Sequence, residues 1–264
     1  MLIICNGVFK SGSTWLHAIV TELLFLRDIQ VSSINKKYTN NIKSPTSIVE
    51  SKFLEFIKNE DFSKKNYINK SHFFSKKVIN KEYPDSVIFL FSVRNIKDSI
   101  VSHYFHIKSK YIIFSNFNFY YWTIGRLKAH EIINYNAKYK NSFPSELFFN
   151  FSDFKNDFDR TIRRIAKLLN LEPLNDQELL TIKSKTSIKN MRNNIVSGKT
   201  NYYSTVKSDR YKLIRSGKIG ESKHFFNKKK SNDIKKINNF QTSLFFKMIY
   251  FFLFTLRRKI LKIE

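Results

Sequence analysis

Residues 1–26, MLIICNGVFKSGSTWLHAIVTELLFL, decide the fold of this 264-residue chain. The apolar run at residues 2–5 predicts a short buried strand, because strands covered on both faces lack polar alternation. Asn6 and Gly7 follow, and residues 10–14, KSGST, form a polar loop; Gly7 and Gly12 are two of the six glycines of the chain. From Trp15 to Leu26, apolar residues recur at helical spacing. The stretch therefore predicts a strand, a loop and a helix in direct succession.

The loop between this strand and this helix predicts a cradle for an anion. A turn at that place aims several backbone N–H groups at one point, and the helix adds the positive end of its dipole. The hydroxyl groups of Ser11, Ser13 and Thr14 are further donors. We therefore expect a phosphate group here, with an ordinary structural turn as the alternative.

The loop comes close to the P-loop pattern G-x-x-x-x-G-K-[ST], with Gly7 and Gly12 at the two glycine positions. Ser13 stands where the P-loop lysine belongs, and the only lysine of the loop is Lys10. No acidic residue ends the strand expected at residues 86–93, where an aspartate would hold magnesium. A P-loop nucleotide kinase or NTPase is therefore an alternative that lacks both its lysine and its metal ligand.

Strand and helix patterns alternate along much of the chain. Further strands are expected at residues 67–72, 86–93 and 146–151, and further helices at 120–140, 157–170 and 175–184. Between residues 30 and 62 we expect a loop with a short helix near 48–57. Such alternation indicates βαβ units. The sequence predicts an α/β fold, a doubly wound parallel sheet flanked by helices, with a P-loop-like strand-loop-helix at its N-terminus.

The composition is strongly basic, with 47 Lys+Arg against 21 Asp+Glu and a formal net charge of +26. This charge indicates a polyanionic partner: a nucleic acid, an anionic membrane or a phosphorylated small molecule. Of the basic residues 36 are Lys and 11 are Arg, and Asn is abundant too, as a bias toward AT-rich codons would produce. The lysines are scattered, so no nucleic-acid partner is expected. A non-catalytic protein that binds nucleic acid or another polyanion is a second alternative.

The single cysteine, Cys5, excludes an internal disulfide framework and a multi-cysteine metal site, and no metal is expected. One cysteine fits a reducing compartment, and the start of the chain lacks the basic and then apolar pattern of a signal peptide. We therefore expect a cytoplasmic protein.

Two further segments carry candidate phosphate ligands. Arg94 follows the strand at residues 86–93, and the carboxyl end of a strand is where open α/β sheets bind ligands. Ser102 lies about two helical turns further on, so a helix there can point it back toward the same crevice. Residues 214–220, IRSGKIG, place an arginine and a lysine around two glycines, which predicts a basic loop that can fold over a phosphate. An ordinary turn is the alternative for that loop.

Taken in chain order, these segments resemble the cytosolic-type sulfotransferase family that uses 3′-phosphoadenosine 5′-phosphosulfate (PAPS). Residues 9–16, FKSGSTWL, resemble its P-K-S-G-T-T-W-L loop for the 5′-phosphosulfate. Residues 94–104 resemble its R-N-P-K-D…V-S-x-Y motif for the 3′-phosphate, and residues 215–220 its R-K-G-x-x-G segment. Residues 70–72, KSH, resemble the strand end that carries the catalytic histidine of the family. The resemblance spans residues 1 to about 226.

The resemblance implies PAPS as the sulfuryl donor and a set of residues that contact it. These are Lys10, Ser11, Gly12, Ser13, Thr14, Trp15, Arg94, Ser102, Thr186, Ile188, Arg215, Ser216 and Gly217. The implied catalytic residues are Lys10, which stabilises the leaving group, His72, which acts as general base, and Lys70. The ordinary pKa of histidine, about 6.5, suits a base near neutral pH.

The chain departs from the pattern of the family at several positions. Phe9 and Ile96 replace prolines, Ser216 replaces a lysine, and Ser222 replaces a tryptophan. Residues 151–153, FSD, resemble a Y-E-D segment with Phe151 for the tyrosine. Residues 186–191, TSIKNM, resemble a T-S-F-x-x-M segment with Ile188 for the aromatic residue. An inactive member of the family that only binds the nucleotide is therefore a further alternative.

The acceptor is not encoded in a motif. We expect residues 30–66 and 105–125 to shape its pocket, and the acceptor to be a hydroxyl or amine of a small molecule, a glycan or a lipid.

The C-terminal stretch differs from the rest in composition. Residues 243–254, SLFFKMIYFFLF, precede Arg257, Arg258 and Lys259, and the apolar run is too short to span a membrane. It predicts either a helix docked on the domain or an interfacial helix on the cytoplasmic face of an anionic membrane. We expect a sulfotransferase domain at residues 1–239 and a helix or tail at residues 240–264.

Overall fold

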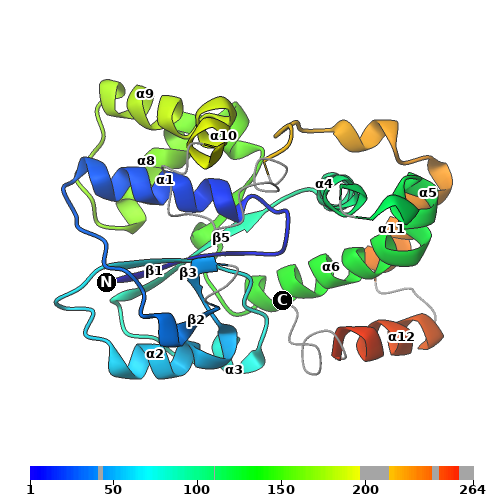
Figure 1. Ribbon diagram of the computed structural model, residues 1–264, viewed down its shortest axis with the longest axis horizontal. Coiled ribbons are helices and arrows are strands. Elements are labelled where there is room, and N and C mark those ends of the chain that lie inside the picture. The colour runs from blue at the N-terminus through cyan, green and yellow to red at the C-terminus, as the bar shows by residue number, and fades with distance from the viewer. Residues whose placement is uncertain (41–43, 110, 197–213, 240–243, 256–264) are drawn as a thin grey trace. The chain divides into compact units, whose positions relative to one another are not determined.

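The four predicted strands pair in parallel, in the order β4-β1-β5-β6 (Figure 1). Their bounds are β1 Leu2–Gly7, β4 Tyr67–Ser71, β5 Val87–Val93 and β6 Phe148–Asn150. The computed structural model describes residues 1–40, 44–109, 111–196, 214–239 and 244–255. The parallel sheet, with helices on both faces, confirms the predicted α/β fold.

Strand β1 is the centre of this sheet and decides where the site lies. All six of its residues are buried, because β4 and β5 flank it and helices cover it. The chain leaves β1 for β4 on one side and later returns to β5 on the other. Such a reversal is the place where open α/β sheets bind ligands. The register brings Asn6 level with Ser71, and Gly7 level with Ser92, at this end of the sheet.

Contacts within the chain divide it into two compact units. Unit 1 comprises Met1–Arg94 and Tyr139–Gly217, and unit 2 comprises Asn95–Lys138 and Lys218–Glu264. The boundary after residue 239 that the sequence predicts stays a prediction, and residues 240–243 and 256–264 of the predicted tail lie outside the described residues.

In unit 1, helices lie on both sides of the sheet (Figure 1). One side carries α1 Ser13–Leu26, α8 Phe158–Leu168, α9 Asp176–Lys185 and α10 Ile188–Val196, and the other carries α2 Phe53–Asn59 and α3 Lys76–Ile79. The short α7 Asp153–Asn156 follows β6. The core under α1 is mainly aliphatic and includes Ile3, Leu16 and Ile162. On the opposite face phenylalanines pack together, with the Phe53 ring 4.5 Å from that of Phe73.

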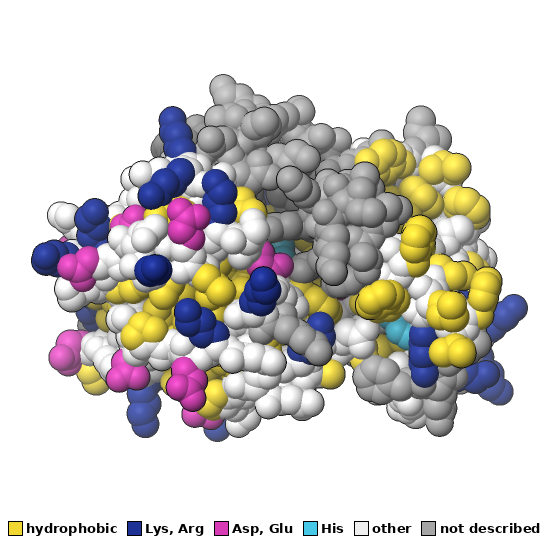
Figure 2. Space-filling view, turned by 90° about the horizontal axis from the view of Figure 1, so that it is seen from below, with side chains coloured by type: hydrophobic (Ala, Val, Ile, Leu, Met, Phe, Trp, Pro, Cys, Tyr) yellow, Lys and Arg dark blue, Asp and Glu magenta, His cyan; other side chains and the backbone are white. Residues whose placement is uncertain are grey.

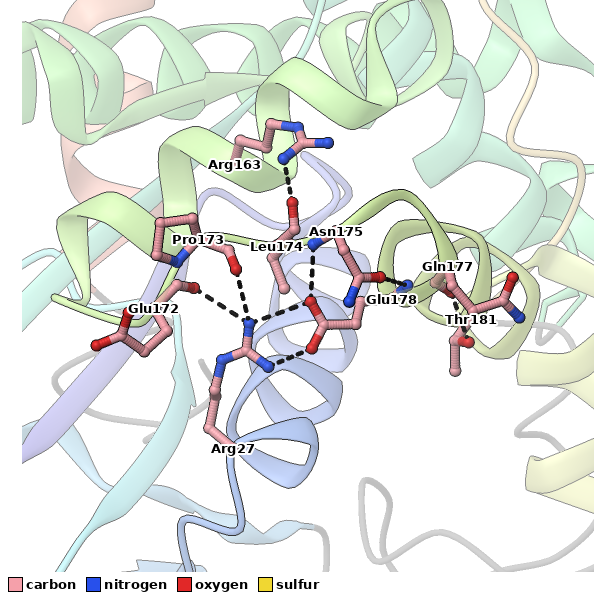
Figure 3. A network of polar contacts seen from close by, with 9 residues as sticks. All are labelled: Arg27, Arg163, Glu172, Pro173, Leu174, Asn175, Gln177, Glu178 and Thr181. Carbon is pink, nitrogen blue, oxygen red and sulfur yellow. Dashed lines mark hydrogen bonds and ion pairs between the residues drawn. The ribbon is translucent and has the colours of Figure 1, made fainter.

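Arg27, which caps the C-terminal end of α1, anchors this helix to the start of α9 (Figure 3). Its guanidinium donates to the Glu178 carboxylate and to the carbonyl oxygens of Glu172 and Pro173. Glu178 also accepts from the backbone N–H of Asn175 at 2.8 Å, and the Asn175 side chain accepts from the N–H of Glu178 at 2.9 Å. This capping box begins α9. The ion pair of Arg27 with Glu178 then holds the C-terminal end of α1 against α9.

Unit 2 is helical in its described residues. Its helices are α4 Ile96–Lys108, α5 Phe117–Tyr120, the greater part of α6 Arg126–Lys140, α11 Lys228–Asn238 and α12 Leu244–Thr255. A bidentate ion pair links α6 to α11: Arg126 Nε and Nη2 lie 2.8 and 2.9 Å from the Asp233 carboxylate. The Tyr121 hydroxyl donates to the same carboxylate at 2.8 Å.

The structure refines three sequence expectations. The helix expected at residues 120–140 is broken by a π-helical turn at Tyr121–Gly125. Between residues 30 and 62, where a loop with a short helix was expected, two short strands also pair antiparallel: β2 Thr39–Asn40 and β3 Ser44–Ile48. Helix α10 was not expected, since its segment is polar and weakly periodic. Among the described residues, no helix is long and apolar enough to cross a membrane.

Candidate functional site

The loop between β1 and α1 leaves the N-terminal end of α1 without a side-chain cap. Its N-cap is Gly12, with φ of 109°, and its first turn contains no acidic residue. The first N–H groups of a helix have no partner within the helix, and the dipole makes that end positive. Lys10, inside the loop, also has a left-handed backbone with φ of 71°, which costs a non-glycine residue about 1–3 kcal/mol. The loop therefore keeps a strained turn at the positive end of α1.

Buried contacts behind the loop fix this turn. The hydroxyl oxygens of Ser11 and Ser92 lie 2.8 Å apart, and both side chains are fully buried. A Cβ at Gly7 would lie 2.3 Å from the Ser92 hydroxyl oxygen and 2.5 Å from that of Ser11, so no side chain fits there. The Ser11 hydroxyl thus joins the loop to β5, a role that the sequence did not indicate.

The ring of Phe151 lies between the loop and the end of β5. A Cβ at Gly12 would approach this ring to 2.7 Å, and the guanidinium carbon of Arg94 lies 4.2 Å from the ring centroid. Such a cation–π contact contributes about 0.5–2 kcal/mol. Phe151 therefore holds Arg94 beside the loop. Phenylalanine serves this purpose without the hydroxyl group that a tyrosine would bring.

His72 follows β4 and lies against the loop from the other side. Its Nδ1 is 2.5 Å from the carbonyl oxygen of Gly7. A carbonyl oxygen can only accept, so Nδ1 carries the hydrogen, and in the neutral ring Nε2 then has the lone pair. The Asn6 side chain steadies this strand end, because its oxygen accepts from the Ser71 hydroxyl at 3.1 Å and from the Phe73 N–H at 3.0 Å.

Lys70 lies two residues before His72, on β4. Burial lowers the pKa of Lys70 to about 8. On the neighbouring helix, burial and the charge of Lys70 lower the pKa of His17 to about 3. His17 is therefore neutral at physiological pH, and Lys70 is the cation of this pair.

The third predicted segment lies against the beginning of α10. Gly217 has φ of 57°, and a Cβ there would lie 2.3 Å from the Ile188 side chain. Arg192 donates to the carbonyl oxygen of Ile214 at 2.7 Å. Thr186 is buried, and its hydroxyl donates to Ile182 within α9 at 2.8 Å. The half-buried Arg215 and Ser216 belong to the same segment.

Lys155 lies near both α1 and the segment at residues 214–220. Its Nζ lies 5.1 Å from the Trp15 ring centroid, and its Cε would be 3.8 Å from a Cβ at Gly217. Trp15 in turn packs edge to face on Phe151, with 5.4 Å between centroids. No sequence motif singled out Lys155, although this residue follows the F-S-D segment by only two positions.

Contacts within unit 1 thus bring most predicted site residues together around the carboxyl end of β1. Ser102 lies in unit 2, where it is buried on α4, and its part in the site stays a prediction. On the same helix, the buried carboxylate of Asp98 accepts from the backbone N–H groups of Gly220 at 2.8 Å and Ser222 at 3.0 Å. Asp98 therefore fixes the end of the third segment within unit 2.

The family model of the sulfotransferase domain matches residues 2–246, which confirms the resemblance indicated by the motifs. Solved structures with a similar fold include mouse sulfotransferase SULT7A1 complexed with PAP. It is 19% identical, with 90% of this chain and 82% of that chain covered and a TM-score of 0.59.

Retinol dehydratase is similar in two complexes, each 15% identical. With androsterone and the inactive cofactor PAP, coverage is 89% of this chain and 78% of that chain, at a TM-score of 0.59. With retinol and PAP, it is 89% and 79%, at a TM-score of 0.56. No curated protein sequence matches significantly.

Proposed function

We propose that this chain, which belongs to the sulfotransferase domain family, moves a sulfuryl group from PAPS to a hydroxyl or amine of an acceptor. The observation that carries the proposal is the contact between His72 Nδ1 and the carbonyl oxygen of Gly7. It supports the role of His72 as base, because the loop that begins at Gly7 is the one to which we assign the phosphosulfate. A nucleotide kinase or NTPase would need an acidic residue at the end of β5, where this chain has Val93 followed by Arg94.

The loop fits the 5′-phosphosulfate of PAPS. Gly7 and Gly12 keep space that a Cβ would fill, and the uncapped end of α1 supplies N–H groups. We assign the phosphosulfate to this cradle, with Lys10, Ser13 and Thr14 around it. When bound, PAPS supplies the sulfuryl group and leaves as the bisphosphate PAP.

We assign the 3′-phosphate to Arg94, Arg215 and the N–H group of Gly217 in unit 1, and the motif at residues 94–104 predicts Ser102 of unit 2 as a further ligand. The contact of Arg94 with Phe151 supports this assignment, because it holds the guanidinium beside the loop. At Gly217 a side chain would meet Ile188, so the backbone there is left open to approach. The 3′-phosphate distinguishes PAPS from ATP, so these residues decide which nucleotide binds.

We assign the adenine side of the site to Trp15, Thr186, Ile188 and Ser216. Trp15 offers an aromatic ring next to the third segment. Because the Thr186 hydroxyl is engaged within α9, its contribution is to shape the wall and not to bind a polar atom of the nucleotide.

During transfer, the oxygen or nitrogen atom of the acceptor bonds to sulfur, and His72 Nε2 takes the proton that this atom loses. The Gly7 carbonyl oxygen then stabilises the imidazolium through Nδ1. As the bond between sulfur and the bridging oxygen breaks, negative charge grows on that oxygen, and Lys10 with the N–H groups of α1 stabilises it. Lys70 adds a second positive charge at the end of β4.

The acceptor in this proposal is a small molecule, a glycan or a lipid. Androsterone and retinol, which occupy the two retinol dehydratase structures, favour an apolar alcohol as the first class to test. We place the reaction in the cytoplasm, where the buried thiol of Cys5 stays reduced.

Sulfur-35-labelled PAPS tests the proposal. The protein is incubated with labelled PAPS and separate pools of apolar alcohols, glycans and lipids, and labelled product is separated from PAPS. Transfer is expected with at least one pool and none with labelled inorganic sulfate. In parallel, PAP is expected to raise the melting temperature far more than AMP does, by mass action. No transfer together with equal shifts from PAP and AMP would contradict both the activity and the 3′-phosphate assignment.

A further inference from the structure

Helix α12 exposes an apolar face. Of its twelve residues, five on one side are largely exposed: Leu244 by 74%, Phe245 by 72%, Met248 by 63%, Phe251 by 69% and Phe252 by 65%. Their spacing, with steps of three and four residues, puts them on one face of the helix. A helix on the surface of a soluble domain normally turns charged residues to that side.

The opposite edge of α12 is anchored within unit 2. The Phe246 and Tyr250 rings lie 4.8 and 5.3 Å from the ring of the buried His130 on α6. The guanidinium carbon of Arg126 lies 4.2 Å from the Phe246 ring centroid. Two aromatic residues one turn apart therefore fix the helix within unit 2 and leave the apolar face outward. The membrane alternative of the sequence analysis stays a prediction at this point.

This face is large for a protein in water. Contiguous apolar patches of more than a few hundred Å² are rare on monomeric soluble proteins and mark interaction sites. In Figure 2 hydrophobic side chains gather in this part of unit 2, with Lys and Arg side chains at the edge of the group. The composition and the exposure together call for an apolar partner.

The charge around α12 selects among apolar partners. Residues 240–263 contain no Asp or Glu, whereas Lys247, Arg257, Arg258 and Lys259 all lie in that stretch. Helix α11 adds the exposed Lys228, Lys229, Lys235 and Lys236 to unit 2. An apolar groove of a protein would leave this positive charge uncompensated, whereas an anionic bilayer offers hydrocarbon and negative headgroups together. A twelve-residue helix is about 18 Å long, too short to span, so it must lie in the interface.

We propose that α12 docks the protein on the surface of an anionic lipid bilayer, with Leu244, Phe245, Met248, Phe251 and Phe252 inserted between the headgroups. The partner is the bilayer itself, not a protein groove or a second copy of the chain. This docking does not depend on the transfer function, because none of its residues belongs to the donor site.

Vesicle sedimentation tests the docking with the full chain. Wild-type protein is expected to sediment with vesicles of phosphatidylcholine and phosphatidylserine, and at least tenfold less with phosphatidylcholine alone or at high salt. The double variant Met248→Ser/Phe252→Ser should bind the mixed vesicles at least tenfold more weakly. The matched control is Phe25→Ser/Leu180→Ser, which removes two equally exposed apolar residues from unit 1 and should bind like wild type.

Three outcomes would overturn the proposal: equal binding by the α12 variant and wild type, equal loss in the control, or no vesicle binding by wild type. Sedimentation velocity without lipid distinguishes a second copy as the partner, since a wild-type dimer that the α12 substitutions dissolve would also refute bilayer docking. Circular dichroism and thermal unfolding without ligand check that each variant is folded. Failure of the sulfuryl-transfer assay leaves these readouts unaffected.

Discussion

Helices α1 and α12 are both rich in apolar residues, yet they meet opposite surroundings. Helix α1 lies over the sheet and buries eight of its fourteen residues, among them Leu16, Ile19 and Leu23. Helix α12 touches its unit through Phe246 and Tyr250 and exposes five apolar residues, Leu244, Phe245, Met248, Phe251 and Phe252, on its other side. Apolar composition therefore does not by itself distinguish a core helix from an interaction surface. The neighbours of each helix decide, and for α1 they also place its N-terminal end at the candidate site.

The comparison predicts that substitutions in the loop before α1 impair sulfuryl transfer without affecting vesicle binding, and that substitutions in α12 do the reverse. The largest effect is expected at the loop before α1, where Lys10→Ala and His72→Ala should each lower turnover at least a hundredfold. A positioned base contributes about 10²–10⁴ in rate, and a cation at the leaving oxygen a comparable amount. Vesicle binding through α12 should stay unchanged. Initial rates with labelled PAPS measure the loss.

Lys64→Ala is the matched control for Lys10→Ala, because the side chain of Lys64 is 81% exposed and lies outside the site. Near-wild-type rates in both loop variants, with folding intact, would end the proposed mechanism. Loss of vesicle binding in either variant would show that the two regions are not independent.

The second effect concerns recognition of the 3′-phosphate by Arg94, which follows β5. Arg94→Lys should weaken PAP binding by about tenfold or more, because lysine lacks the planar fork that stacks on Phe151 and binds phosphate in two places. AMP, without a 3′-phosphate, should bind the variant as it binds wild type. Isothermal titration calorimetry with both nucleotides measures the difference. A loss of the same size for AMP would assign Arg94 to general folding of the site.

A third effect is expected in unit 2, on helix α4. Asp98→Ala removes the acceptor of the Gly220 and Ser222 N–H groups, and the buried Ser222 donor left unsatisfied costs about 1–3 kcal/mol of unfolding free energy. Urea unfolding should therefore show a clear loss of stability, whereas Asp85→Ala, at an exposed turn, should be close to neutral. Equal stability of the two variants would remove the structural role of Asp98.

The parts of the fold that the sequence predicted are those that depend on local pattern. Strands β1 and β5 are continuous apolar runs, and the loop between β1 and α1 contains its own glycines and hydroxyl groups. Contacts between distant segments had no such signal. Asp98 and Gly220 are 122 positions apart, and nothing near either residue indicates the other.

The sequence likewise did not indicate which side of α12 packs on the protein and which side is exposed. The sequence of α12 is apolar at nearly every position, so its hydrophobic periodicity could not show which side of the helix packs on α6. The contact between Ser11 and Ser92 was likewise unpredicted, because a serine within an apolar strand looks like a tolerated exception. In each case the deciding information is the identity of the neighbour and not the residue itself.

The smallest expected effect is the pH dependence that Lys70 introduces beside the loop of α1. Burial lowers the pKa of Lys70 from 10.5 to about 8, so its positive charge is present below pH 8 and is lost above it. If that charge assists transfer, turnover should fall a few-fold as pH rises through 8. Stability should change in the opposite direction: between pH 8 and 10.5 the unfolded chain binds more protons at this lysine than the folded chain, so the free energy of unfolding should rise with pH.

Lys70→Met tests both signs at once. Relative to wild type, the variant should lose the fall in turnover near pH 8 and also the rise in stability above it, whereas vesicle binding through α12 should be the same in both proteins at each pH. Turnover is measured with labelled PAPS and stability by urea unfolding, both from pH 6 to about 10. A fall in turnover near pH 8 that persists in Lys70→Met would belong to another group, and Lys70 would then be a structural residue of β4 and not part of the transfer site.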